Sequence, residues 1–498
     1  MKLLLPLAAV ASLGLVLAAQ SGCSGSSGTP DSGTPGDSGS PPDAAIGSYT
    51  YVTLDPNGND LTFLSMAVGP NDRVGVAYFQ ATDGGVDAAV LLPDGGIDRT
   101  QSLFLRNYDV RYVEWSAGTG LVPSQHVTNA TGNVQVQVLA GVSLAFQSNG
   151  QPAVAYLGGP DKDLSPYWFQ QNPMLNLRQT GGTWTEVQVD SYSPNISPPA
   201  WDLPDPVDLN ASGNVLGLYP SLAVDATGLI YFAYRDVHTG QFPKQDWAGS
   251  DLKIAWGTSA ALSGSAGAVY CAGGSSCSGV AFGGNNKNAF GGHIQLAMGL
   301  GGQPAVVSDQ IFDNGVGAGS NILFNQRAST GTWNPRYDSP SEVVQATSIL
   351  SATQDAPGPS LAFDDPTVGG IGYGVAYSEP TLGKLSFIQS ANGVSWIPPD
   401  PVFQSGSGGW YPSLAIDPVL HTPSIAFYFC SASPGVSPQL CPAAQDNIQI
   451  AENVGGNWVF TIVDPDGFYT PKLGILSSGK RVLVYQMRDG SLRLAVEN

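Results

Sequence analysis

The chain has 498 residues, of which Gly 63 and Pro 38 together make up about one in five. That share is below the roughly 25–30% that marks a low-complexity chain, and a hydrophobic content of 42% is enough to build a core. Lys and Arg number 19 against 39 Asp and Glu, which gives a net charge of −20. Nucleic-acid binding is therefore excluded as a function class, because it relies on basic side chains that neutralise phosphates.

Residues 1–22 have the pattern of a secretory signal peptide, since Lys2 precedes an uncharged run that is too short to span a bilayer. The end of this segment resembles the lipobox of bacterial lipoproteins, in which small residues precede an acylated cysteine, here Cys23. This resemblance implies lipidation at Cys23, with a plain secretory signal and a free cysteine as the alternative. Ser24 follows where an Asp would act as an inner-membrane retention signal, so the resemblance implies anchoring to the outer membrane, facing the periplasm or the surface.

The segment 23–46 contains Gly, Ser, Pro, Thr and Asp and no large apolar side chain before its last residue. Such a composition cannot bury enough surface to offset the entropy of ordering. We therefore predict a tether that holds a domain, 47–498, away from the membrane. The membrane contact is expected through the lipid alone, and the domain is expected to be a monomer.

A repeated hairpin pattern dominates the rest of the chain. Each copy has a short apolar strand, a turn of Asp, Asn, Gly or Pro, and an alternating strand that usually ends in Tyr. The copies lie at 64–78, 142–156, 220–234, 294–308, 359–377, 412–428 and 471–485. A second hairpin with a Gly turn and a Trp follows several copies, and four strands per repeat are typical of a β-propeller blade. The Trp residues are expected to pack between outer strands; they are Trp184, Trp333, Trp396 and Trp458.

The two ends of the chain suggest how the ring closes. The last repeat stops after its third strand, 491–498, whereas 49–56 has the pattern of the outer strands of other repeats. Pairing these two segments would complete the last blade and remove an open sheet edge. The sequence therefore predicts an all-β fold, a seven-bladed propeller with four-stranded antiparallel blades, in which an N-terminal strand closes the last blade. A six- or eight-bladed ring is the alternative.

Four cysteines remain once Cys23 is set aside, an even number in an exported chain, where thiols are oxidised. Three pairings are possible, and the local one, Cys271 with Cys277 and Cys430 with Cys441, closes two short loops. A zinc site is the alternative, but the cysteines of the two pairs are six and eleven residues apart, and no His is adjacent to them or between the two cysteines of a pair. Hairpin turns carry Asp225, Asp364 and Asp417, which we expect to cap their own backbone, with calcium binding as the alternative. We predict no metal site and no cofactor.

The Gly-x-Trp turns, such as STGTW at 329–333, resemble a degenerate Asp box of sialidase-like propellers, without the Asp. This resemblance implies the fold only. The chain lacks an HExxH motif, a GxSxG elbow and a P-loop, so no catalytic residue is assigned and an enzyme is not favoured.

Ligands are expected around the central funnel, where inner strands begin and second strands end. The candidates there are Tyr219, Arg235, Asp236, His293, Asp309, Glu379, Trp410, Tyr411, Tyr469 and Gln486. Aromatic faces beside charged groups suit a glycan or a protein ligand, although the same residues also suit packing. The sequence favours a lipid-anchored, non-catalytic binding or scaffolding module. The alternative is a carbohydrate-active hydrolase or lyase with carboxylates in the funnel.

Overall fold

The computed structural model describes the part of the chain that carries the repeats. The described residues are 44–57, 64–81, 107–127, 134–135, 141–158, 172–189, 216–236, 249–259, 288–313, 318–329, 333–334, 341–346, 358–379, 382–406, 408–433 and 440–498. All belong to one unit of the chain, Gly39–Asn498. The predicted signal peptide, Cys23, and Cys271 with Cys277 lie outside the described residues.

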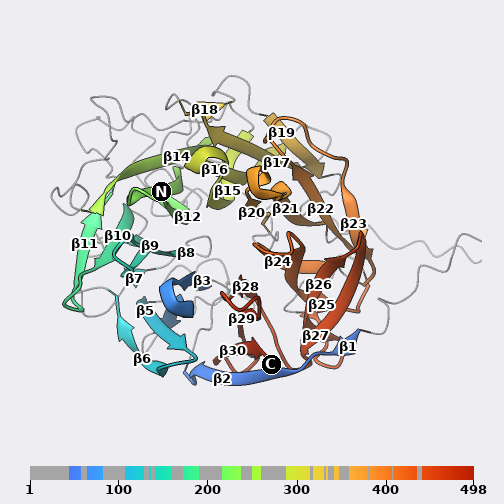
Figure 1. Cartoon of the computed structure of the whole chain (residues 1–498), viewed down its shortest axis with the longest axis horizontal. Coiled ribbons are helices and arrows are strands. Elements are labelled where there is room, and N and C mark those ends of the chain that lie inside the picture. The colour runs from blue at the N-terminus through green and yellow to red at the C-terminus, as the bar shows by residue number, and fades with distance from the viewer. Residues whose placement is uncertain are drawn as a thin grey trace, which may run out of the picture. The chain divides into compact units, whose positions relative to one another are not determined.

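The predicted seven-bladed β-propeller is confirmed, with small antiparallel sheets that follow one another in chain order around a centre (Figure 1). From the inside outward, blade 1 contains β3 (Leu64–Gly69), β4 (Arg73–Ala81), β5 (Asn107–Ser116) and β6 (Gly120–His126). Blade 2 contains β8 (Val142–Phe146), β9 (Pro152–Gly158), β10 (Asn172–Arg178) and β11 (Trp184–Gln188). Blade 3 contains β12 (Leu216–Val224), β13 (Leu229–Asp236) and β14 (Gly249–Thr258). A short strand, β7 (Val134–Gln135), also pairs with β5.

Blade 4 contains β15 (Asn288–Met298), β16 (Pro304–Asp313) and β17 (Ala318–Arg327), and β17 pairs with both β18 (Trp333–Asn334) and β19 (Ser341–Ala346). Blade 5 contains β20 (Ser360–Asp364), β21 (Gly372–Glu379), β22 (Lys384–Ser390) and β23 (Asp400–Gln404). Blade 6 contains β24 (Gly409–Ile416), β25 (Pro423–Cys430), β26 (Asp446–Val454) and β27 (Asn457–Asp464). A two-residue parallel contact joins β14 to β15. Three 3₁₀ turns, η1 (Pro70–Asp72), η4 (Leu300–Gly302) and η5 (Pro366–Val368), lie within the innermost hairpins.

The last blade is closed by the N-terminal strand, as the sequence predicted. Blade 7 contains β28 (Lys472–Ile475), β29 (Arg481–Gln486) and β30 (Leu492–Glu497), and β2 (Tyr49–Asp55) is its outer strand. The register of β2 on β30 runs antiparallel from Tyr49 opposite Glu497 to Asp55 opposite Leu492. A two-residue strand, β1 (Ala45–Ile46), lies just ahead of β2 and pairs in parallel with β27 of blade 6.

Apolar side chains fill the spaces between neighbouring blades. The cluster between blades 7 and 1, for example, joins Leu54, Leu492 and Leu494 to Val74 and Val76. The predicted role of the outer tryptophans is confirmed where their side chains are described: Trp184 lies edge-on to Tyr112, Trp396 to Phe324 and Trp458 to Phe387, with ring centroids 5.8, 5.0 and 5.7 Å apart. In each pair the Trp contacts the third strand of the preceding blade. The side chain of Trp333 is not among those described.

The acidic residues of the hairpin turns cap backbone amides, as expected. The Oδ1 atom of Asp225 accepts hydrogen bonds from the amides of Thr227 and Leu229, both at 2.9 Å. Asp417 accepts in the same way from Val419 and Leu420. The carboxylate of Asp364 accepts from the amide of Ile371 and also contacts the imidazole of His421. These carboxylates therefore stabilise tight turns.

The predicted disulfide between Cys430 and Cys441 is present, with a Cα–Cα distance of 6.1 Å. Cys430 is the last residue of β25, and Cys441 precedes β26, so the bond ties the loop between these strands at its base. Both cysteines are buried. No helix among the described residues is long and apolar enough to cross a membrane.

Candidate functional site

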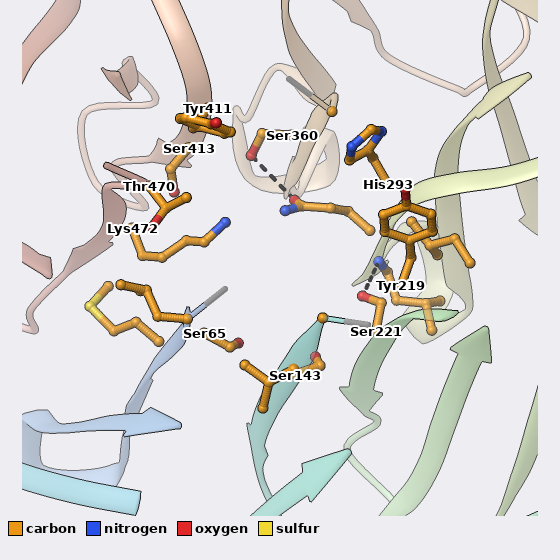
Figure 2. Close-up of a pocket in the computed structure, with 18 of the residues that line it drawn as sticks. Ser65, Ser143, Tyr219, Ser221, His293, Ser360, Tyr411, Ser413, Thr470 and Lys472 are labelled. Carbon is orange, nitrogen blue, oxygen red and sulfur yellow. Dashed lines mark hydrogen bonds between the residues drawn. The ribbon is translucent and has the colours of Figure 1, made fainter. Parts of the chain in front are cut away.

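The innermost strands of the seven blades surround a central cavity of about 320 Å³ (Figure 2). Each blade contributes the same strand position to its wall. The residues at this position are Ser65, Ser143, Ser221, Gln295, Ser360, Ser413 and Lys472. In the sequence each of them immediately precedes the Leu or Met that recurs in every hairpin.

Six of these residues form hydrogen bonds that link successive blades from the first to the seventh. A side-chain oxygen of one blade accepts the backbone N–H of the residue that follows the equivalent position in the next blade. The bonds run from the amides of Leu144, Leu222, Leu296, Leu361, Leu414 and Leu473 to Ser65, Ser143, Ser221, Gln295, Ser360 and Ser413, at 2.8 to 3.2 Å. The wall of the cavity is therefore held in place by the polar groups that line it.

A second repeated feature lies two residues before this position. The backbone there adopts positive φ angles at Tyr219 (50°), His293 (46°), Tyr411 (54°) and Thr470 (43°). This left-handed conformation costs about 1–2 kcal/mol for a residue with a Cβ atom. Register shifts in the pairing of β12, β15 and β24 bracket the first three of these residues, which marks a bulge in each strand. Bulges redirect side chains, and here all four residues line the cavity.

Tyr219 and His293 form a pair on one side of the cavity, with ring centroids 4.7 Å apart and a tilt of 44° between the planes (Figure 2). Gly358, in the equivalent position of the next blade, leaves room for the imidazole, because a Cβ atom at Gly358 would overlap the Cβ of His293. Tyr411 and Thr470 lie on the other side of the cavity with Lys472. The cavity therefore offers phenol, imidazole and hydroxyl groups together with one ammonium group.

Lys472 points into the cavity from β28 (Figure 2). Its surroundings lower the pKa of the ammonium group from 10.5 to about 8, because the enclosing strands remove water from the charge. The described part of the chain provides Lys472 with no ion-pair partner and no hydrogen bond. The residue as a whole is half-buried.

Three of the ten funnel candidates, Tyr219, His293 and Tyr411, line the cavity. Arg235 is fully buried on β13, where burial lowers the pKa of its guanidinium group and the charge of Tyr219 opposes that shift. Glu379 is buried and forms an ion pair with Lys384 at 3.4 Å. The positions of Asp236 and Asp309 are known for the backbone only, in β13 and β16.

The remaining candidates belong to the core beside the cavity. Trp410 is buried next to Tyr411, with ring centroids 6.3 Å apart. Tyr469 is buried and stacks on Tyr428. Gln486 is buried, and its backbone N–H donates to the backbone carbonyl of Tyr469 at 3.2 Å. The sequence thus predicted the region of the cavity, but the candidate list also included residues that pack in the core.

Sequence reasoning missed Thr470. It also missed the position that lines the cavity in every blade, here called the ring position: Ser65, Ser143, Ser221, Gln295, Ser360, Ser413 and Lys472. Its signal was present in the hairpins, where Ser precedes the recurring Leu or Met in five of the seven copies. Lys472 departs from that pattern, because it is the charged residue at a position that is uncharged in the other six copies.

Carboxylates are missing from the described wall of the cavity, since none of its described lining residues is Asp or Glu. The described residues also contain no cluster of three or more His, Cys, Asp or Glu side chains that could hold a metal ion. Among the described lining residues, the groups that could transfer protons are His293, Lys472 and the phenols of Tyr219 and Tyr411.

No protein-family model and no curated protein sequence matches this chain. Among solved structures, an ulvan lyase, a polysaccharide lyase bound to -[GlcA(1-4)Rha3S]-, is similar with a TM-score of 0.52 and 9% identity over 90% of this chain and 96% of that chain. The NanB sialidase from Streptococcus pneumoniae follows with a TM-score of 0.40 and 8% identity over 89% of this chain and 69% of that chain. An α-L-arabinofuranosidase from Fusarium graminearum is similar with a TM-score of 0.42 and 12% identity over 79% of this chain and 94% of that chain. At these low identities the likeness concerns the fold alone.

Proposed function

We propose that this protein is a carbohydrate-active propeller that binds a saccharide in its central cavity. The observation that carries the proposal is the strained backbone at equivalent positions of four blades, which turns Tyr219, His293, Tyr411 and Thr470 toward the cavity. Strain of this kind persists where the surrounding structure enforces it, and it is concentrated at functional sites. Aromatic and hydroxyl groups are also the side chains that recognise sugar rings. The glycan-active neighbours agree with this assignment at the level of the fold.

For catalysis we assign proton transfer to His293, with Tyr219 as its partner. Imidazole both takes and gives protons near neutral pH, and the adjacent phenol can donate to a leaving oxygen. The ring centroids lie 4.7 Å apart, so one substrate can contact both groups. Hydrolysis by two carboxyl groups about 5–10 Å apart would need acids that the described cavity wall does not contain. Elimination or another base-catalysed reaction fits this wall better.

A non-catalytic binding module is the second candidate. It is favoured by the same absence of carboxylates from the described lining residues, because most glycoside hydrolases depend on a carboxylate pair. In that case the cavity would recognise a sugar without turning it over, and the exported protein would retain glycans.

Substitution of His293 separates the two candidates. We expect wild-type protein to degrade at least one member of a polysaccharide and glycoside panel, and His293→Ala to lower kcat by about 10²–10⁴-fold, the usual contribution of a general acid or base. Tyr219→Phe should lower kcat with a smaller effect on KM, since it keeps the ring. His421→Ala is the matched control, because this histidine pairs with Asp364 in a hairpin turn away from the cavity.

Two results would redirect the proposal. Retention of glycans without any turnover by the wild-type protein favours the binding module. If Asp236→Asn, Asp309→Asn or Glu379→Gln abolishes turnover while His293→Ala does not, a carboxylate carries the chemistry and our assignment of His293 is wrong.

We also propose that the protein is exported and anchored to the outer membrane through lipid on Cys23. Each buried methylene of an acyl chain contributes about 0.8 kcal/mol, so two or three chains hold a protein on a bilayer stably. Cys23→Ala should move the protein from the membrane fraction to the soluble fraction in its native type of host, measured by fractionation and immunoblotting. Unchanged partitioning would refute the anchor.

A further inference from the structure

Lys472 interrupts a pattern that the other six blades obey. In those blades the ring position carries a side-chain oxygen that accepts an amide of the next blade. Lys472 has no acceptor atom, since an ammonium group only donates. The equivalent amide of the next blade is that of Met66, on the neighbouring strand β3. The described residues contain no seventh bond of this kind, so within them this junction has no acceptor for the amide of Met66.

The same junction has a surplus of donors. Lys472 brings a positive charge into the cavity, and the described residues supply no carboxylate to balance it. Met66 and Lys472 both line the cavity, on adjacent strands. One anionic oxygen group at this place would accept from the ammonium group and would also fill the acceptor position that a serine fills in the other blades. Charge-assisted bonds of this kind are the strong ones.

We propose that the junction between β28 and β3 binds the anionic group of an acidic saccharide, a carboxylate or a sulfate, with Lys472 as the residue that determines specificity for charge. This inference rests on the proposed carbohydrate function and names its substrate class. Lys472 replaces the hydroxyl that would make the ring complete, and a buried charge is costly unless it is paired. A bound anion supplies the missing partner.

The overall charge limits which acidic saccharides fit. A net charge of −20 repels a long polyanion at distance. The cavity volume of about 320 Å³ is at the small end of ligand sites. A single charged sugar, or the end of a chain, therefore suits this site better than the middle of a polyanionic strand.

Anion binding should depend on pH in a defined direction. Lys472 must be protonated to bind the anion, and its pKa of about 8 means that affinity falls as the pH rises through about 8. Among the described residues, the other titratable groups that face the cavity are His293, Tyr219 and Tyr411. If the fall in affinity with pH is absent in Lys472→Ser, it comes from the titration of Lys472 and not from that of the other groups.

The test measures the affinity of the purified chain for glucuronate, galactose 6-sulfate, glucose and inorganic sulfate by calorimetry. We expect both acidic sugars to bind the wild-type protein at about pH 7, and Lys472→Ser to bind them about ten- to a hundredfold more weakly, the effect of one hydrogen bond to a charged group. Lys472→Arg should keep most of the affinity. Lys480→Ser is the matched control, since this lysine of the same blade is exposed in a hairpin turn. The affinity for glucose should be the same in all three variants as in the wild-type protein.

Each other outcome has a definite meaning. Equal binding of glucuronate by wild type and Lys472→Ser overturns the inference, as does binding of inorganic sulfate without either acidic sugar. Binding of glucose as tight as that of the acidic sugars overturns it too, but leaves the proposed carbohydrate function intact. If no sugar binds, charged or neutral, the proposed function itself fails. The melting temperature of each variant shows whether the ring is still folded.

Discussion

Deletion of residues 44–56 should prevent the propeller from forming a stable, closed ring. The deleted segment contains β2, which covers the edge of β30 from Tyr49 to Asp55. It also supplies buried Leu54, and Asp55, whose carboxylate accepts the hydroxyl of Tyr78 in blade 1. Without it the edge of β30 becomes an open template for pairing with other chains. The expected loss is comparable with the whole stability of a domain, about 5–15 kcal/mol.

Circular dichroism melts and size-exclusion chromatography would measure this effect. A chain that lacks only residues 24–43 is the matched control, and it should melt like the full-length protein. Leu54→Ala provides a milder test, with an expected loss of about 2–5 kcal/mol from the cavity left in the core between blades 7 and 1. An unchanged melting temperature for the chain without residues 44–56 would show that β2 does not close the ring.

Replacing Lys472 by serine should stabilise the protein at neutral pH. The folded state holds the ammonium group at a pKa of about 8, against 10.5 in the unfolded chain. Between these values the unfolded state binds more protons, so the stability of the wild-type protein rises with pH across this window. Below about pH 8 the full cost applies. It is on the order of 3 kcal/mol at most, from about 1.4 kcal/mol per pKa unit, and water in the cavity reduces it.

Lys472→Ser removes this cost and provides a hydroxyl that can accept the amide of Met66, as in the other blades. Its advantage over the wild type should be largest near pH 7 and should shrink as the pH approaches about 10. Burial raises the pKa of Tyr49 to about 12, and this titration cancels in the comparison because both proteins contain it. Urea unfolding at several pH values provides the measurement, with Lys480→Ser as control. A variant less stable than the wild type at pH 7 would contradict the prediction.

The fold was accessible from the sequence because each blade repeats one hairpin. The pairing of 49–56 with 491–498 followed from the missing last strand and from the shared pattern of outer strands, and β2 on β30 confirms it. The disulfide between Cys430 and Cys441 followed from spacing and is present. These features depend on local patterns that recur, so one sequence was sufficient to find them.

The direction of individual side chains was much harder to predict. Neighbouring Trp410 and Tyr411 were both placed in the funnel, but only Tyr411 lines the cavity, while Trp410 is buried. A bulge at this point shifts the pairing of β24 between Trp410 and Ser413, and one such shift exchanges the two faces of a strand. Alternation alone cannot locate that shift. The ion pair of buried Glu379 with the half-buried Lys384 likewise depends on the register that places these residues opposite each other on β21 and β22.

The entry of the chain into the ring has a mechanical consequence. Ala45 and Ile46 are hydrogen-bonded to β27 of blade 6, and only a few residues later the chain becomes the outer strand of blade 7. A pull on the N-terminal end is therefore shared between two blades before it reaches the closing strand. Single-molecule stretching from that end should first detach the short parallel strand, at low force, and then release β2 in a second, larger rupture.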